Sequence, residues 1–286
     1  MGVLFAIIAL LSWGSGDFLI QRSTRKFGDW ISLFYITAIG AIILSFFVYN
    51  DLELIFTLKN FFLLVAASIL ILFVALSEFE AFRVGKISVI EPILALEVLV
   101  TVALSSAILR EHLNFLQTLS IAFLLLGIIL VSIKSFHHFK KFHLERGIWH
   151  AFFATLGMGV VNLLFGVGSR NMSPLLVNWF TSAFIALVCL VYIVAHSRYK
   201  EALEDLKKNK KLIFGVGIVD NIAWIAYSYA TLFIPIAIAI GISESYIALA
   251  ATLGMILNKE KLKKHQVAGL VVCVISVVVL SIITEV

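Results

Sequence analysis

The dominant pattern along the chain is a series of long apolar runs separated by short polar segments. Ten of these runs approach the roughly 20 residues that an α-helix needs to cross the hydrocarbon core of a bilayer. The runs cover approximately Val3–Gln21, Trp30–Tyr49, Phe61–Phe82, Ile87–Leu109, Phe115–Ile133, Gly147–Gly168, Pro174–Ala195, Leu212–Leu232, Ile234–Leu257 and Gln266–Ile283. The sequence lacks the strand-length alternation of apolar and polar positions that is typical of a membrane β-barrel. The pattern predicts an all-α integral membrane protein with ten transmembrane helices.

The composition favours lipid rather than water as the solvent. Of the 286 residues, 62% are hydrophobic and 14% are charged, whereas about a quarter of the residues of a soluble protein are usually charged. The net charge of +5 does not indicate a nucleic-acid partner, because the basic residues lie in short segments between apolar runs, where they act as topology signals. Cys189 and Cys273 fall inside apolar runs, so we expect free thiols and no disulfide.

The two halves of the chain resemble each other. Arg110–Leu113 with Gln117 matches Lys259–Leu262 with Gln266, and both stretches lie between the fourth and fifth runs of a half. At the front of each half, three positions correspond in order: Gly2 with Gly147, Gly14 with Gly159, and Asp17 with Asn162. Because five helices is an odd number, the second half would enter the membrane from the opposite side, as in the inverted repeats of secondary transporters. We therefore predict two inverted five-helix repeats, residues 1–140 and 141–286; chance similarity between apolar segments is the alternative.

Three features together carry a family resemblance. They are the tandem five-helix halves, the Arg-Glu-x-Leu and Lys-Glu-x-Leu turns, and Trp13-Gly14 in the first helix. From Gly2 to about Leu280, the chain resembles the EamA family of the drug/metabolite transporter superfamily. The resemblance implies a secondary carrier for metabolites, with a central cavity lined by the first, third, fourth, sixth, eighth and ninth helices. It does not imply a particular substrate.

The distribution of basic residues predicts the orientation in the membrane. Of the 22 Lys and Arg residues, 19 lie in the odd-numbered loops, and basic loops remain on the cytoplasmic side. We therefore expect a plasma (inner) membrane protein with odd loops in the cytoplasm and both termini outside, although members of the family more often have both termini inside. In the seventh loop, Tyr199–Lys211 predicts a short amphipathic helix on the cytoplasmic surface.

Seven acidic residues lie within or near the runs, and depth separates them into two groups. Four lie near helix ends that carry basic residues: Asp17, Glu78, Glu80 and Glu91. These four form either interfacial ion pairs or an acidic vestibule on the cytoplasmic side. No Lys or Arg occurs in the middle of a run.

Glu97, Asp220 and Glu244 lie near the centres of their runs. A bare carboxylate at that depth costs at least about 2.5 kcal/mol, so it must face water, bind a partner or be protonated. Either each is a protonated carboxyl bonded to a neighbouring helix, or together they form a binding site for a ligand or a proton.

Neighbouring residues favour the binding site. Trp224 and Tyr227 share a helical face with Asp220, and Tyr246 follows Glu244 in a polar run. We expect these three aromatic residues to bind substrate together with Glu97, Asp220 and Glu244. Secondary candidates for the cavity are Asp17, Glu91, Thr101, Asn162 and Asn221.

The chain lacks the motifs of several other chemistries. It has no phosphate-binding loop, HExxH motif or cysteine cluster, so we expect no ATP drive, metal or cofactor, and no enzymatic activity. We predict a secondary carrier of cationic or amine-containing, amino-acid-like solutes, with protons as a candidate coupling ion. The expected partners are a small-molecule substrate and the lipid bilayer, and a homodimer stays open.

Two alternatives stay open. The first is a carrier of neutral or anionic metabolites, which would need cationic groups in its cavity. The second belongs to another class: an intramembrane enzyme, a lipid scramblase or a membrane subunit without transport of its own.

Overall fold

The computed structural model describes residues 1–85, 90, 93–132, 146–246, 248–249 and 263–285, and all regular structure in these ranges is helical. The helices of the first half are α1 (Gly2–Phe27), α2 (Asp29–Leu44), the 3₁₀ helix η1 (Tyr49–Phe56), α3 (Leu58–Val84), α5 (Glu97–Leu109) and α6 (Phe115–Ser132). Those of the second half are α7 (Ile148–Asn171), α8 (Pro174–Ala195), α9 (Tyr199–Lys208), α10 (Lys210–Phe233), α11 (Ile236–Ser243) and α13 (Lys264–Glu285).

Six described helices are long and apolar enough to cross a membrane: α1, α3, α7, α8, α10 and α13. Large apolar side chains cover the outside of the bundle; Phe46 and Phe73, for example, are 81% and 64% exposed. Water would penalise such a surface, whereas lipid tails tolerate it. The prediction of an all-α, multi-pass membrane protein is therefore confirmed, while the number of ten spans stays a prediction.

The second predicted run, Trp30–Tyr49, is not one straight helix. Helix α2 ends at Leu44, and the chain bends by 108° into η1 before α3 begins at Leu58. The apolar sequence continues through Phe46 and Phe47, so hydropathy alone did not mark this bend.

The fourth run of each half is interrupted close to a glutamate. In the first half, the chain turns at residues 95–96, and α5 begins at Glu97. In the second half, α11 ends at Ser243, and the chain turns at residues 244–245. The backbone there makes i→i−3 hydrogen bonds, such as Leu96 N to Ile93 O and Ser245 N to Ile242 O, which are typical of a locally tightened helix. Both predicted runs are thus broken where they carry their acidic residue.

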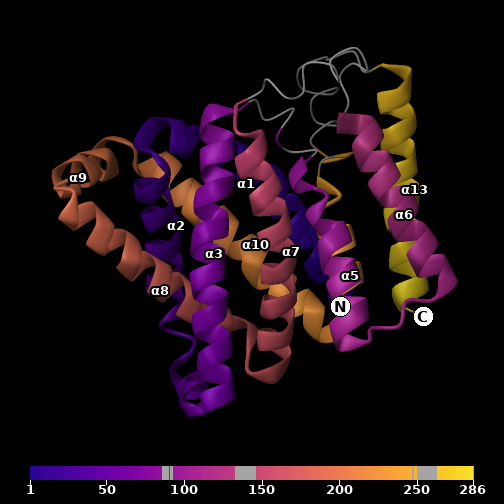
Figure 1. The fold of residues 1–286 in the computed structure, drawn as a ribbon, viewed down its shortest axis with the longest axis horizontal. Coiled ribbons are helices and arrows are strands. Elements are labelled where there is room, and N and C mark those ends of the chain that lie inside the picture. The colour runs from indigo at the N-terminus through magenta and orange to yellow at the C-terminus, as the bar shows by residue number, and fades with distance from the viewer. Residues whose placement is uncertain (86–89, 91–92, 133–145, 247, 250–262, 286) are drawn as a thin grey trace.

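Helix contacts follow one scheme in both halves (Figure 1). The first helix of each half packs against the third helix of the other, α1 against α10 and α7 against α3. The second helices pack together as α2 and α8, and the fifth as α6 and α13. Likewise, α7 contacts α5 as α1 contacts α11. The predicted pair of similar halves would give this exchange of partners.

Helix α9 packs across the end of α2 outside the set of apolar helices. The Tyr35 hydroxyl of α2 donates a hydrogen bond to the Ala202 carbonyl, and Arg198 forms an ion pair with Glu201 at 2.8 Å. This guanidinium holds the pKa of Glu201 below its usual value. The predicted helix within Tyr199–Lys211 is therefore confirmed, and it ends at Lys208.

Helices α6 and α13 meet at two glycines. A Cβ atom added at Gly127 would lie 2.6 Å from Cys273 Sγ and 2.8 Å from the Gly269 carbonyl oxygen. A Cβ atom at Gly269 would lie 2.7 Å from the Gly127 carbonyl oxygen. Backbone therefore touches backbone at this crossing, which only small residues allow.

Gly127→Ala should lower the stability of the protein in detergent by about 1–3 kcal/mol, because the added methyl group forces the α6 and α13 backbones apart. The midpoint of thermal unfolding measures this effect. Gly215→Ala is the matched control, since its nearest neighbour would be Leu19 Cδ1 at 4.0 Å. Equal midpoints for the two variants would contradict the close crossing.

Candidate functional site

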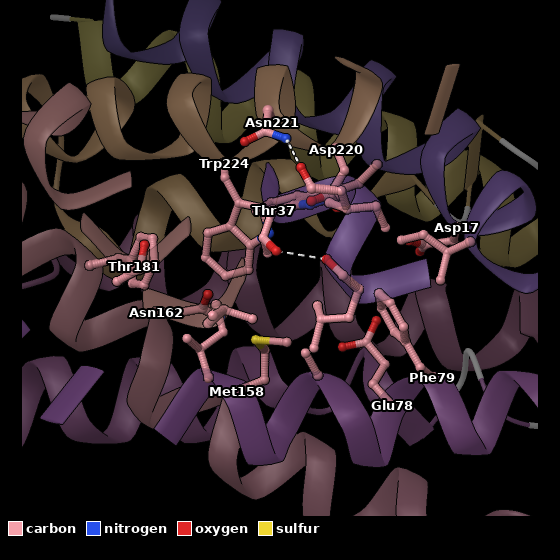
Figure 2. Close-up of a pocket in the computed structure, with 18 of the residues that line it drawn as sticks. Asp17, Thr37, Glu78, Phe79, Met158, Asn162, Thr181, Asp220, Asn221 and Trp224 are labelled. Atoms are coloured by element: carbon pink, nitrogen blue, oxygen red, sulfur yellow. Dashed lines mark hydrogen bonds between the residues drawn. The ribbon is translucent and has the colours of Figure 1, made fainter. Parts of the chain in front are cut away.

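A pocket lies between the helices at the middle of the bundle and encloses about 100 Å³. Helices α1, α2, α3, α5, α7, α8 and α10 line it, together with the residues that follow α11. Figure 2 shows the side chains gathered around this space, with Asp17 and Glu78 on one side and Asn162 and Thr181 on the other. Helices α6 and α13 contribute no lining residue among those described.

The charge of the pocket has one sign. Five acidic residues line it: Asp17, Glu78, Glu97, Asp220 and Glu244. Among the described lining residues there is no Lys, Arg or His. Carboxyl groups gathered in a small volume away from bulk water cannot all stay ionised on their own. Either some of them are protonated, or a cation balances their charge. The pocket is therefore chemically suited to protons or to a positively charged group.

Most of the residues predicted for substrate binding line this pocket. They are Glu97, Asp220, Trp224, Glu244 and Tyr246, joined by the secondary candidates Asp17, Asn162 and Asn221. Glu91 lies outside the described residues. The structure thus brings together side chains from five separate segments, namely α1, α5, α7, α10 and the residues that follow α11, while their role in binding stays a prediction.

Two candidates do not belong to the lining. Tyr227 is fully buried, and its hydroxyl donates a hydrogen bond of 3.0 Å to the Asn162 carbonyl. Thr101 is also fully buried, and its hydroxyl faces the carbonyls of Glu97 and Gly159. Both residues support lining residues from behind, because their polar atoms are engaged by neighbouring backbone.

The acids near helix ends were predicted either to form interfacial ion pairs or to line an acidic vestibule. Glu80 pairs with Arg83, which also contacts Asp29 at 3.2 Å, so Glu80 is an interfacial ion-pair residue. Asp17 and Glu78 line the pocket. Sequence position alone did not separate these cases, because Glu78 and Glu80 are two residues apart and point to different sides of α3.

Asn162 connects the pocket to its supporting layer. Its Nδ2 donates to Glu97 Oε1 at 2.8 Å and to Thr101 Oγ1 at 3.4 Å. With Glu97 ionised, the opposite amide orientation would turn Oδ1 toward the carboxylate, so the orientation with Nδ2 toward Glu97 is favoured. In this orientation, the fully buried Oδ1 has no hydrogen-bond partner among the described residues. A buried acceptor in this state costs about 1–3 kcal/mol, which a donor from a guest molecule or water would recover.

The side-chain amides of the other lining asparagines also donate their hydrogen bonds to oxygen atoms of the protein. Asn178 Nδ2 donates to the Pro174 carbonyl and to Ser228 Oγ, both at 2.8 Å. Asn221 Nδ2 donates to the carbonyls of Ile36 at 2.9 Å and Gly217 at 2.7 Å. The lining hydroxyls behave alike, since Thr37 and Thr181 donate to carbonyls one turn back in their own helices. Amides and threonines therefore leave mainly acceptor atoms for a guest.

Aromatic rings form one wall of the pocket. Trp13 and Trp224 meet edge to face with ring centroids 5.4 Å apart, and Phe165 lies 4.7 Å from Trp224. Tyr227 packs behind Trp13 at 5.7 Å. Such a wall can contact the apolar part of a solute or the positive charge of a cation.

Sequence reasoning missed the contribution of α2 and α8. Thr37, Asn178, Thr181 and Ser182 come from these helices. They carry no charge, so they did not stand out from the apolar runs. An amide within a spanning helix, such as Asn178 in the second turn of α8, was the available signal.

An ionic cluster closes the end of the bundle where α7 and α10 finish. Arg170 Nη1 pairs with Glu111 at 2.8 Å, and its other nitrogens donate to the carbonyls of Thr231 at 2.7 Å and Ile234 at 3.1 Å. Glu111 also accepts from the backbone N–H of Ile236 at 3.1 Å, at the start of α11. One arginine thus joins the turn after α5 to α7, α10 and α11.

A simpler version of this contact occurs in the first half of the chain, where α1 and α3 end. Arg25, near the end of α1, donates to the Gly85 carbonyl at the end of α3 at 2.8 Å. In both halves, an arginine near the end of the first helix therefore binds backbone carbonyls at the end of the third.

Comparison with known proteins places these features in a family. A family model described as the EamA-like transporter family matches residues 1–133 and again residues 145–282. In three dimensions the chain is similar to a protein of known crystal structure, with a TM-score of 0.72 and 14% sequence identity over 99% of this chain and 96% of the other. At that identity the likeness concerns the fold alone. Sequence comparison with curated proteins finds no match.

Arg170→Gln should destabilise the protein by about 1–3 kcal/mol, because hydrogen bonds to charged groups are lost and Glu111 loses its counter-ion. Arg170→Lys should not restore stability, since one ammonium nitrogen cannot replace the guanidinium fork that reaches three acceptors. Thermal unfolding in detergent measures both variants. The control is Arg22→Gln on the exposed side of α1, which should unfold like wild type. If Arg170→Lys matched wild type, the fork would have no structural role.

Proposed function

Since the chain belongs to the EamA-like transporter family, we propose that this membrane transporter is a secondary carrier of small cationic or amine-containing solutes. The observation that carries the proposal is the pocket itself, in which five carboxyl groups face a space without a lining Lys, Arg or His among the described residues. A guest with a positive charge would neutralise these groups, whereas a guest with a negative charge would add to their repulsion.

The architecture proposed for this carrier consists of ten spans in two inverted repeats. Two successive matches to the same family model support it, as do the exchanged helix pairs and the broken fourth helix of each half. Both chain ends also lie at the same end of the bundle (Figure 1), as an even number of spans requires. Rocking of one half against the other would then open a midplane site to each side in turn.

Proton coupling follows from the same chemistry. A carboxyl group that is protonated when the pocket is empty can release its proton when a cation binds, which exchanges H⁺ for solute. Asp17, Glu97 and Asp220 line the same small pocket, so these groups would respond to binding as a set.

The rival functions have less support. A carrier of anionic metabolites would place its substrate among carboxylates. A neutral metabolite would leave their charge unbalanced. An intramembrane enzyme or a subunit without transport of its own is separated from a carrier by solute flux into vesicles that contain only this protein.

Glu97→Gln, Asp220→Asn and Glu244→Gln test the role of the carboxylates. In proteoliposomes that take up a labelled amine, we expect at least one variant to lose about tenfold or more of the uptake, because a charged interaction is worth roughly 1.5–3 kcal/mol. The pH dependence of uptake should change in the same variant. Glu204→Gln, on the exposed face of α9, is the matched control. Wild-type uptake and pH dependence in all three pocket variants would overturn the proposal.

The charge distribution also predicts an orientation with both termini outside. A C-terminal reporter that works only in the cytoplasm should therefore stay silent, whereas the same reporter inserted between α8 and α9 should be active. Strong activity of the C-terminal fusion would reverse the orientation without affecting the pocket.

A further inference from the structure

Asn162 lines the acidic pocket, and its unpartnered Oδ1 acceptor would specify the ligand more narrowly than charge does. Carboxylates attract any cation, including a quaternary ammonium that has no N–H group. An amide oxygen contributes to binding only if the guest donates a hydrogen bond to it. The buried Oδ1 therefore distinguishes cations that carry N–H donors from cations that do not.

The position of this acceptor is fixed by the surrounding contacts. Both donors of the Asn162 amide are held by Glu97 and Thr101, and the Asn162 carbonyl is held by Tyr227. The close approach of α7 and α5 at Gly159, where a Cβ atom would lie 3.2 Å from the Thr101 nitrogen, keeps the two helices in register. Oδ1 is consequently held in place next to a carboxylate, as an acceptor that no donor among the described residues occupies.

Apolar and acidic surfaces on either side of this acceptor suggest how a guest lies. Glu97 provides the counter-charge beside Asn162, and Figure 2 shows Asn162, Met158 and Trp224 around the same space. Phe165 adds to the aromatic wall at 4.7 Å from Trp224. An ammonium head at Glu97 and Asn162 would leave a short apolar tail against Trp224 and Phe165.

We propose that the pair Glu97–Asn162 is the recognition site for a primary ammonium group, with Asn162 Oδ1 and the Glu97 carboxylate accepting its N–H donors and the Trp224 wall holding the apolar tail. This inference rests on the proposed function, since it names the substrate class for the same pocket. A small amine with a short aliphatic or aromatic tail fits the volume of about 100 Å³.

A series of four amines with one tail tests the proposal. Butylammonium, N-methylbutylammonium, N,N-dimethylbutylammonium and butyltrimethylammonium carry three, two, one and no N–H donors at neutral pH. Their binding to the purified full chain can be followed by intrinsic tryptophan fluorescence and by calorimetry. We expect the affinity to fall along the series, by tenfold or more between the first and the last.

The Asn162→Leu variant separates hydrogen bonding from size. It removes the acceptor while keeping a side chain of similar volume, so the preference for butylammonium over butyltrimethylammonium should shrink by about tenfold. Asn162→Asp keeps an acceptor oxygen and should keep the preference. Thr118→Val, on the exposed face of α6 away from the pocket, should also keep it and serves as the control for an unrelated substitution. Thermal unfolding of each variant identifies those that fold.

The outcomes discriminate between the two proposals. Equal affinity of the wild-type protein for all four cations would overturn the ammonium site and leave a general cation carrier, whether or not Asn162→Leu folds. An unchanged preference in folded Asn162→Leu would also overturn it, because pocket size would then explain the series. Binding of none of the four amines would overturn the proposed cationic substrate and this site with it.

Discussion

The free energy needed to hold carboxyl groups among lipid-embedded helices constrains the whole centre of this protein. Five acids line one space, and protons or a cation that enters it would relieve their repulsion. The surrounding polar groups follow the same constraint. The donors of Asn162, Asn178 and Asn221 are used by carboxylate, hydroxyl and backbone oxygens, so the protein stabilises its own acceptors without filling the pocket.

A second layer of residues makes that arrangement rigid. Tyr227 and Thr101 do not reach the guest space, yet they fix the Asn162 side chain and main chain from behind. The broken fourth helices add to this effect. Because α5 begins at Glu97 and α11 ends next to Glu244, each acid lies where a helix changes direction rather than on an uninterrupted apolar face. The acids that line the pocket, Glu97 and Glu244, are therefore also the residues at which the helices are interrupted.

The sequence predicted a helix well where an apolar run suited to lipid coincides with capping residues that mark its start. Helix α8 has the predicted bounds, Pro174–Ala195, because Ser173 caps the helix and accepts from Leu176 N, and Pro174 suits its first turn. The bend after Leu44 and the turns beside Glu97 and Glu244 were not predicted, since apolar residues continue through them. For the pocket, charge within an apolar run found Glu97, Asp220 and Glu244. Tyr227 was predicted to line the pocket because it shares a helical face with Asp220, yet it lies behind the lining. Helical periodicity does not show which other helix packs against each part of a face.

The way Arg170 is held has a consequence for how the sequence can vary. Two of its three partners are main-chain oxygens, those of residues 231 and 234, which any amino acid supplies. The link itself therefore places no requirement on the side chains at these two positions, whereas it requires the guanidinium and the carboxylate of Glu111. Homologous chains that preserve this joint should keep an arginine and an acid at positions 170 and 111. The link alone would produce little covariation between position 170 and positions 231 or 234, because the carbonyl acceptors there belong to the main chain.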